Sequence, residues 1–209
     1  MIDKLGNYFL DSVLYKGETV TEEKREIMLF GITRILEDIP KYIGIFLLSM
    51  LLNILPEVGV VLLITIMYKF FVGGAHARTN IGCFISSILY FWTPVYFAKF
   101  VNLAQIHVYI LYSITFFASL YVIVKIAPAD TGEVPILNKN KRKKIKISAF
   151  ISLILIYIVS LLIINNIFIQ TLIVITILLI DIFTTEPLYR LFKCQYSYET
   201  EEFKEYYNN

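Results

Sequence analysis

Apolar runs long enough to lie inside a lipid bilayer dominate this 209-residue chain. Six such runs occupy roughly residues 42–55, 58–71, 81–97, 104–126, 147–164 and 167–182. Hydrophobic residues make up 57% of the chain, which exceeds what a soluble domain of this length carries. We therefore predict an all-α, polytopic integral membrane helix bundle with about six spans, embedded in the lipid bilayer.

The first two apolar runs are short. Each holds only about 14 residues, against the ~20 that a helix needs to cross a ~30 Å hydrocarbon layer. Pro56 and Glu57 lie between them, as in a hairpin in a thin membrane or in a re-entrant hairpin. A bundle of four spans is therefore open beside the bundle of six.

The first 40 residues are too polar to span a membrane. Apolar residues recur there at helical spacing, among them Ile27, Met28 and Ile32, with charged residues between them. We expect amphipathic helices over residues 1–40 that lie on the membrane surface or cover the cytosolic face, ending near Pro40. The transmembrane bundle should then occupy residues 41–183, and a cytosolic tail residues 184–209.

The positions of the basic residues predict the orientation. A loop expected over residues 127–146 holds the densest cluster, which is Lys139, Lys141, Arg142, Lys143, Lys144 and Lys146. Lys69 and Arg78 flank a glycine pair, and further basic residues lie in the tail. Because basic loops stay on the cytoplasmic side, we expect a multi-pass protein of the cell membrane with both termini and the basic segments in the cytoplasm.

A polar break between the second and third runs carries the residues best suited to catalysis. Its sequence over residues 73–83 is GGAHARTNIGC, with one of the two histidines and one of the two cysteines of the chain. On one straight helix, the backbones of His76 and Cys83 would be about 10 Å apart, too far for proton transfer. The three glycines of this break permit the bend that would bring the two side chains together.

We expect Thr79 or Asn80 to cap the helix of the third run, so that Cys83 lies in its first turn. There the positive end of the helix dipole favours the thiolate. The backbone amides of Gly82 and Cys83 are candidates for an oxyanion hole. Taken alone, a His and a Cys at this spacing are more often a packed thiol and a hydrogen-bonded histidine than a catalytic pair.

Other kinds of site find no support in the sequence. The two histidines and two cysteines lack the paired spacing of metal ligands, so we expect no metal and no cofactor. Phosphate-binding glycine loops and nucleic-acid modules are also lacking, so no nucleic-acid partner is expected. Both cysteines should be free thiols, because they fall on the cytosolic side in this topology.

Two segments of the chain resemble the accessory gene regulator B (AgrB) family of membrane cysteine endopeptidases. The first is Gly74-Ala75-His76-Ala77, followed by five residues and Cys83. The second, residues 127–136 with the sequence APADTGEVPI, is similar to the family's Ala-Pro-Ala-x-Thr-x-x-x-Pro-Ile segment and is likewise followed by a lysine-rich run. The length of the chain, its span pattern and the order of the motifs also fit.

The resemblance implies a peptide-processing enzyme of quorum sensing. Members of the family cleave a short propeptide and join the new carboxyl end to an internal Cys or Ser, which closes a thiolactone or lactone. By this resemblance Cys83 is the nucleophile, and His76 is the general base and then the general acid. Gly74 matches the glycine that shapes the backbone, and Lys69 stands where some members have Arg, which binds carboxylates differently from Lys.

The expected substrate is a short amphipathic propeptide with an acidic C-terminal tail. That tail would be drawn to Lys141, Arg142 and Lys143 of the basic loop by an attraction that salt weakens. The resemblance also allows a homodimer, although no span shows a small-residue pairing motif.

Several further residues are expected to support the site. Asp130 is the best candidate for orienting His76, whereas Glu57, His107 and Asp181 are interpreted as buried or interfacial residues. We expect supporting roles for Arg78, Asn80 and Gly82, and we expect Cys194 to pack at the membrane interface.

Two other functions stay open. A non-enzymatic peptide transporter or exporter would use the polar residues of its spans as a path, and His76 and Cys83 would be incidental to it. A different membrane protease would keep the His–Cys pair but would release a linear product.

Overall fold

The computed structural model describes residues 7–8, 10, 21–77, 79–132 and 135–208. Helices make up the regular structure of this part of the chain, and two isolated bridges join its loops. The chain divides into two units, residues 1–53 and 54–209, and each is described by itself. Long apolar helices in the second unit confirm the prediction of an all-α membrane bundle.

The first unit contains one long helix, α2 (Glu22–Leu51). The prediction of a helix end near Pro40 is wrong, because Pro40 lies inside α2. A proline inside a helix removes one backbone hydrogen bond. An ion pair spans this position, since Lys41 Nζ lies 2.9 Å from Asp38 Oδ1. The first apolar run is therefore largely the second half of α2. Most of the amphipathic helix expected before α2 lies outside the described residues.

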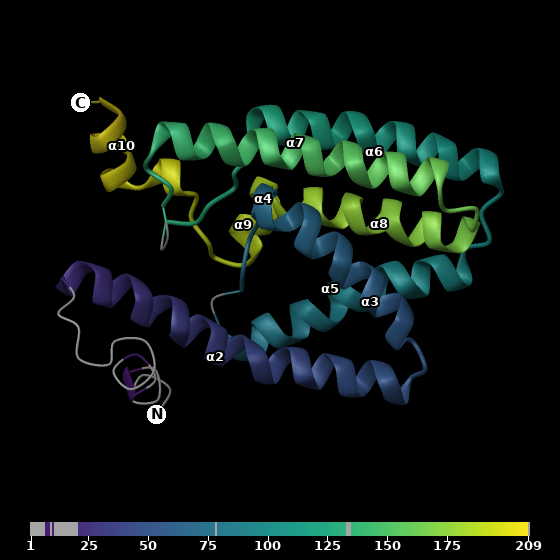
Figure 1. Cartoon of the computed structure of the whole chain (residues 1–209), viewed down its shortest axis with the longest axis horizontal. Helices are drawn as coiled ribbons and strands as arrows, with labels where there is room; N and C mark the ends of the chain where they lie inside the picture. The colour runs from purple at the N-terminus through teal and green to yellow at the C-terminus, as the bar shows by residue number, and fades with distance from the viewer. Residues whose placement is uncertain (1–6, 9, 11–20, 78, 133–134, 209) are drawn as a thin grey trace. The chain divides into compact units, whose positions relative to one another are not determined.

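The second unit holds the remaining apolar runs (Figure 1). Its first helical segment consists of three consecutive elements: α3 (Leu55–Ile64), the π-helical η2 (Thr65–Lys69) and α4 (Phe70–Val72). The helices that follow are α5 (Asn80–Phe100), α6 (Gln105–Lys125), α7 (Lys139–Leu162) and α8 (Ile167–Phe183). Four stretches are long and apolar enough to cross a membrane, namely Leu55–Val72, Ile81–Phe100, Gln105–Lys125 and Lys139–Leu162, while α8 is apolar but has 17 residues. Six spans therefore stays a prediction.

The basic cluster lies on a helix and not in a loop. We predicted a loop over residues 127–146, but α7 begins at Lys139 and so contains all the basic residues of the cluster. Asn138 caps this helix, because its Oδ1 accepts a hydrogen bond from the Lys141 amide at 3.0 Å. Lysine and arginine are good helix formers, and no glycine or proline interrupts this stretch.

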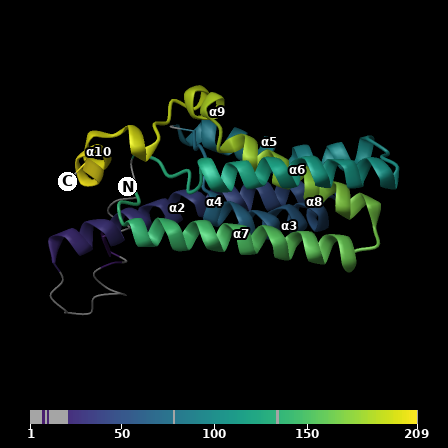
Figure 2. The same ribbon diagram turned by 90° about the horizontal axis from the view of Figure 1, so that it is seen from above.

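The short helix α8 forms the centre of the second unit. It contacts α3, α5, α6 and α7, and the chain enters it from α7 through a turn at residues 163–166 (Figure 2). The Asp181 carboxylate is buried on α8 and accepts hydrogen bonds from Tyr68 Oη at 3.0 Å and Ser119 Oγ at 2.5 Å. The interpretation of Asp181 as a buried hydrogen-bonding residue is confirmed, and these bonds meet the requirement for partners inside a bilayer.

Candidate active site

The chain leaves α4 through two glycines with positive φ angles, 84° at Gly73 and 139° at Gly74. A Cβ atom on Gly73 would lie 2.4 Å from the carbonyl oxygen of Ala129, and one on Gly74 would lie 3.3 Å from that of Phe183. Glycine adopts these φ angles without steric cost and lets the backbones approach this closely. The described residues from Gly73 to Thr79 are not helical, so His76 and Cys83 do not share one straight helix.

The loop between α6 and α7 holds the backbone beside the glycines. The Ala129 amide donates to the Val72 carbonyl at 2.8 Å, and the Gly74 amide donates to the Ala129 carbonyl at 3.1 Å. On the other side, the Ala75 amide donates to the Phe183 carbonyl at 2.8 Å. Backbone hydrogen bonds therefore join the two segments, far apart in sequence, on which the family resemblance rests.

The C-terminal tail completes this support. It contains α9 (Glu186–Leu191), η3 (Ser197–Glu199) and α10 (Glu201–Asn208). Tyr189 Oη donates to the Ala129 carbonyl at 2.7 Å, and burial raises the pKa of Tyr189 well above its usual range, so this donor stays protonated. The rings of Tyr189 and Tyr196 stack with centroids 3.7 Å apart.

A thiol of the tail also reaches residues 74–77, the segment that carries His76 and that we call the histidine segment. Cys194 Sγ donates a hydrogen bond to the backbone carbonyl of His76. We expected only interfacial packing of Cys194, because no local pattern links a tail residue to a loop more than a hundred positions earlier. The contacts of Tyr189 and Tyr196 were missed for the same reason.

Cys83 lies in the first turn of α5, as predicted. Thr79 is the N-cap, and its Oγ1 accepts from the Gly82 amide at 3.1 Å while its carbonyl accepts from the Cys83 amide at 2.8 Å. The prediction that the amides of Gly82 and Cys83 form an oxyanion hole is therefore wrong, since capping already engages both. Arg78 and the side chain of Asn80 lie outside the described residues.

Lys69, the last residue of η2, is close to Cys83. Its ammonium group interacts electrostatically with the Cys83 thiol, and Nζ lies 4.5 Å from the centroid of the Tyr90 ring and 5.2 Å from that of Phe183. No ion pair within the described part of the chain involves Lys69. Its charge is thus held by aromatic faces, without a carboxylate to neutralise it.

His76 sits at the end of the supported backbone segment with its side chain exposed, and Cys83 is half-buried. Both cysteines are free thiols. The structure thus brings Lys69 to Cys83 and fixes the backbone that carries His76. The pairing of the imidazole with the thiol stays a prediction.

The family profile described as "Accessory gene regulator B" matches residues 3–185 of the chain. The chain belongs to the AgrB family. It is 27% identical over 127 residues to an AgrB-like protein of Clostridium perfringens strain SM101, a match covering 59% of each chain. It is 28% identical over 144 residues to an AgrB-like protein of Clostridium beijerinckii, covering 68% of this chain and 69% of the relative. The match thus spans less than two thirds of the C. perfringens protein, and no solved structure matches the chain.

In this AgrB protein the matched residues include both motifs but end before α9. Tyr189, Cys194 and Tyr196, which support the histidine segment from the tail, therefore lie beyond the matched part of the chain.

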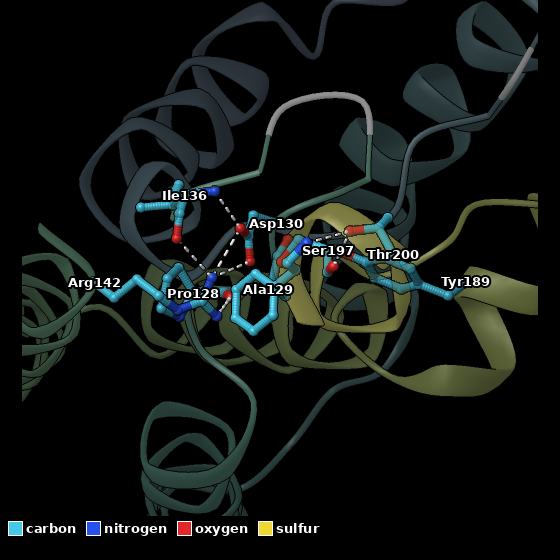
Figure 3. Close-up of polar contacts among 9 residues, drawn as sticks. Pro128, Ala129, Asp130, Ile136, Arg142, Tyr189, Ser197 and Thr200 are labelled. Carbon is cyan, nitrogen blue, oxygen red and sulfur yellow. Dashed lines mark hydrogen bonds and ion pairs between the residues drawn. The ribbon is translucent and has the colours of Figure 1, made fainter. Parts of the chain in front are cut away.

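Two acidic residues considered for the site are engaged elsewhere. The Asp130 carboxylate accepts from Arg142 Nη1, 2.8 Å from each oxygen, and from the Ile136 amide at 2.7 Å (Figure 3). Glu57 Oε1 pairs with Lys99 Nζ at 3.0 Å. Lys99 follows Cys83 along α5 at a distance of about 24 Å. Glu57 thus lies at the other end of this helix from the nucleophile candidate.

Proposed function

We propose that this AgrB protein is a membrane-embedded cysteine endopeptidase that cleaves a short propeptide of quorum sensing and cyclises the product. The observation that carries the proposal is the placement of Cys83 in the capped first turn of α5, within electrostatic reach of Lys69. A helix N-terminus and a nearby ammonium group both stabilise a thiolate, which is the nucleophilic form of cysteine. The Gly73–Gly74 turn and its hydrogen bonds hold the backbone of the candidate base, His76.

In the first step, Cys83 Sγ attacks the scissile carbonyl of the propeptide, and His76 accepts the thiol proton. The resulting oxyanion is stabilised by Lys69, whose ammonium group interacts electrostatically with the Cys83 thiol. The C–N bond then breaks, His76 passes its proton to the leaving amine, and the C-terminal fragment departs. An acyl thioester on Cys83 remains.

In the second step, an internal thiol or hydroxyl of the bound peptide attacks this thioester. The Cys83–acyl bond breaks as the ring bond forms, and the proton of the attacking group passes by way of His76 to the Cys83 thiolate. Thioester exchange with a thiol is nearly balanced in energy, whereas attack by water would give a linear acid. The site must therefore hold the peptide folded back and exclude water.

The propeptide docks through its acidic tail on the exposed lysines at the start of α7. Four exposed lysines lie there within the first two turns of α7, namely Lys139, Lys141, Lys143 and Lys144. Raising the salt concentration should weaken this attraction without changing the chemistry.

The test uses the full chain reconstituted in lipid vesicles and a candidate propeptide, a short amphipathic peptide with an internal Cys or Ser and an acidic C-terminal tail. We expect a cleaved, cyclic product from the unchanged protein and none from Cys83→Ala. Cys194→Ser is the matched control, because it removes the other thiol but retains a donor to the His76 carbonyl. Cleavage that persists in Cys83→Ala would overturn the assignment of the nucleophile.

The same assay separates the other two functions. A transporter or exporter would leave the propeptide uncut. A protease that only hydrolyses its substrate would release a linear peptide, whose mass exceeds that of the ring by one water.

A further inference from the structure

The Arg142 side chain binds its own chain instead of facing solvent. Nη1 lies 2.8 Å from both carboxylate oxygens of Asp130 and donates to the Ile136 carbonyl at 3.3 Å, and Nη2 donates to the Pro128 carbonyl at 3.2 Å. The exposed fractions of the two side chains are 17% for Arg142 and 7% for Asp130. Figure 3 shows the guanidinium group pointing into the loop that carries these acceptors. The exposed neighbours Lys141 and Lys143 make no such contact in the described residues.

The acidic partner in this pair adjoins the residue that holds the histidine segment. Asp130 follows Ala129, whose amide and carbonyl bond to Val72 and Gly74. The Asp130 carbonyl also accepts from the Ser197 amide at 3.1 Å, and the Gly132 amide donates to the Gln195 carbonyl at 3.0 Å. The loop is thus fixed to α7 on one side and to the tail on the other, and it supports the backbone that leads to His76.

We propose that Asp130 and Arg142 are positioning residues of the peptidase site and that neither contacts the substrate. Their ion pair holds Ala129 against the Gly73–Gly74 turn, and this contact fixes the place of His76 relative to Cys83. The inference rests on the proposed function for its catalytic consequence. It assigns to Arg142 a role different from that of the lysines beside it.

A charge pair suits this task, because its geometry is directional and its loss is costly. The planar guanidinium binds the carboxylate and two carbonyls at once, which a lysine ammonium on a flexible stem cannot reproduce. Removing one partner leaves the other charge without its counterion in a largely buried place. A shift of a catalytic group by about 1 Å can lower a rate by about a hundredfold, so a loosened loop should be visible in the reactivity of Cys83.

The experiment compares four single variants and one double variant of the full chain in lipid vesicles, each in a Cys194→Ser background so that only Cys83 is labelled. Asp130→Asn and Arg142→Gln remove the ion pair, and Lys141→Gln and Lys143→Gln remove the same kind of charge from the same helix. The first readout is the rate of alkylation of Cys83 by iodoacetamide at neutral pH. The second is the hydrogen exchange of the Gly74 and Ala75 amides.

We expect Asp130→Asn and Arg142→Gln to slow alkylation by about tenfold or more and to speed the exchange of both amides. Lys141→Gln and Lys143→Gln should change neither. The exchanged pair Asp130→Arg/Arg142→Asp should recover part of the amide protection if the charges meet again. This last variant also identifies a general folding defect, since such a defect would not be rescued.

Two results would overturn the inference. One is unchanged amide exchange in both Asp130→Asn and Arg142→Gln, and the other is an equal effect of the lysine variants. A failure of the proposed function looks different: alkylation of Cys83 would then be insensitive to His76→Ala as well. The exchange of Gly74 and Ala75 would still report whether the ion pair holds the loop.

Discussion

At the scale of single residues, the site depends on glycines at positions where a Cβ atom would clash with its neighbours. Gly73 is the clearest case, because it combines a φ of 84° with an approach to Ala129 that leaves no room for a Cβ. Gly82 is another, since a Cβ there would lie 2.7 Å from the capping Oγ1 of Thr79. Gly73 lets the two motifs meet, and Gly82 lets α5, the helix that carries Cys83, begin where it does.

Gly73→Ala should therefore destabilise the second unit by at least about 1 kcal/mol and abolish peptide processing, because the strained φ and the clash act together. Thermal unfolding in mixed micelles, measured beside the cleavage assay, checks this. Gly59→Ala is the matched control, since Gly59 lies in α3 with open space around its Cα. Equal effects of the two substitutions would show that the close contact with Ala129 is not needed.

Thr79 is the residue that fixes the start of α5. Thr79→Ala should cost about 1 kcal/mol of helix stability and slow the alkylation of Cys83 at neutral pH, because the first turn that carries the thiol would fray. Thr79→Ser keeps the accepting oxygen and should restore both values. If Thr79→Ala and Thr79→Ser labelled equally fast, the cap would have no part in the reactivity of Cys83.

At the scale of elements, the π-helical turn η2 links the core to the site. Tyr68 points from it to Asp181 on α8, whereas the next residue, Lys69, lies over the rings of Tyr90 and Phe183 near Cys83. The carbonyl of Met67 in the same turn accepts from Ser152 of α7. Such turns often occur at functional sites because they change which residues face inward. Here η2 directs Tyr68 to the core and Lys69 to Cys83.

Ser119→Ala tests the buried network that holds this turn. It removes the donor to Asp181 Oδ2 and should lower the free energy of unfolding by about 1.5 to 3 kcal/mol, the range for hydrogen bonds to charged groups. Ser113→Ala on the same helix is the control, because Ser113 is exposed and its hydroxyl donates to the Tyr109 carbonyl one turn before it. A value below that of the control would mean that Asp181 does not depend on Ser119.

The local patterns of the sequence predicted most helices but not their limits. Five apolar runs correspond to the helical segment from α3 to α4 and to α5, α6, α7 and α8. The patterns failed at Pro40, where α2 continues, and at the basic cluster, where α7 has already begun. In both places a change of polarity suggested a boundary, although helical hydrogen bonding continues across it.

The candidate site was predictable only in its local parts. The cap by Thr79 and the place of Cys83 follow from residues within one turn of each other. Other contacts join segments that no short sequence pattern relates. These are the hydrogen bonds of Ala129 to Val72 and Gly74 and the ion pair of Arg142 with Asp130. For this reason Arg142 resembled a substrate contact in the sequence.

At the scale of the whole second unit, the proposed chemistry requires several segments to meet at one end. Hydrogen bonds link the glycine turn to the end of η2 and to the loop after α6, and they link that loop to the start of α7 and to the tail after α8. The tail in turn bonds to the carbonyl of His76. The lysine-rich start of α7 is among these segments, and its cytoplasmic placement stays a prediction. The Glu57–Lys99 pair lies at the other end of α5.

The intact mass of the protein after reaction with a trapped substrate tests most directly whether Cys83 carries the acyl intermediate. In that substrate the internal Cys or Ser of the propeptide is replaced by Ala, so that the ring cannot close and the thioester accumulates. We predict a mass increase equal to the N-terminal fragment less one water, located on Cys83 and lost in Cys83→Ala. Cleavage without such an adduct, or an adduct on Cys194, would show that Cys83 is not the nucleophile.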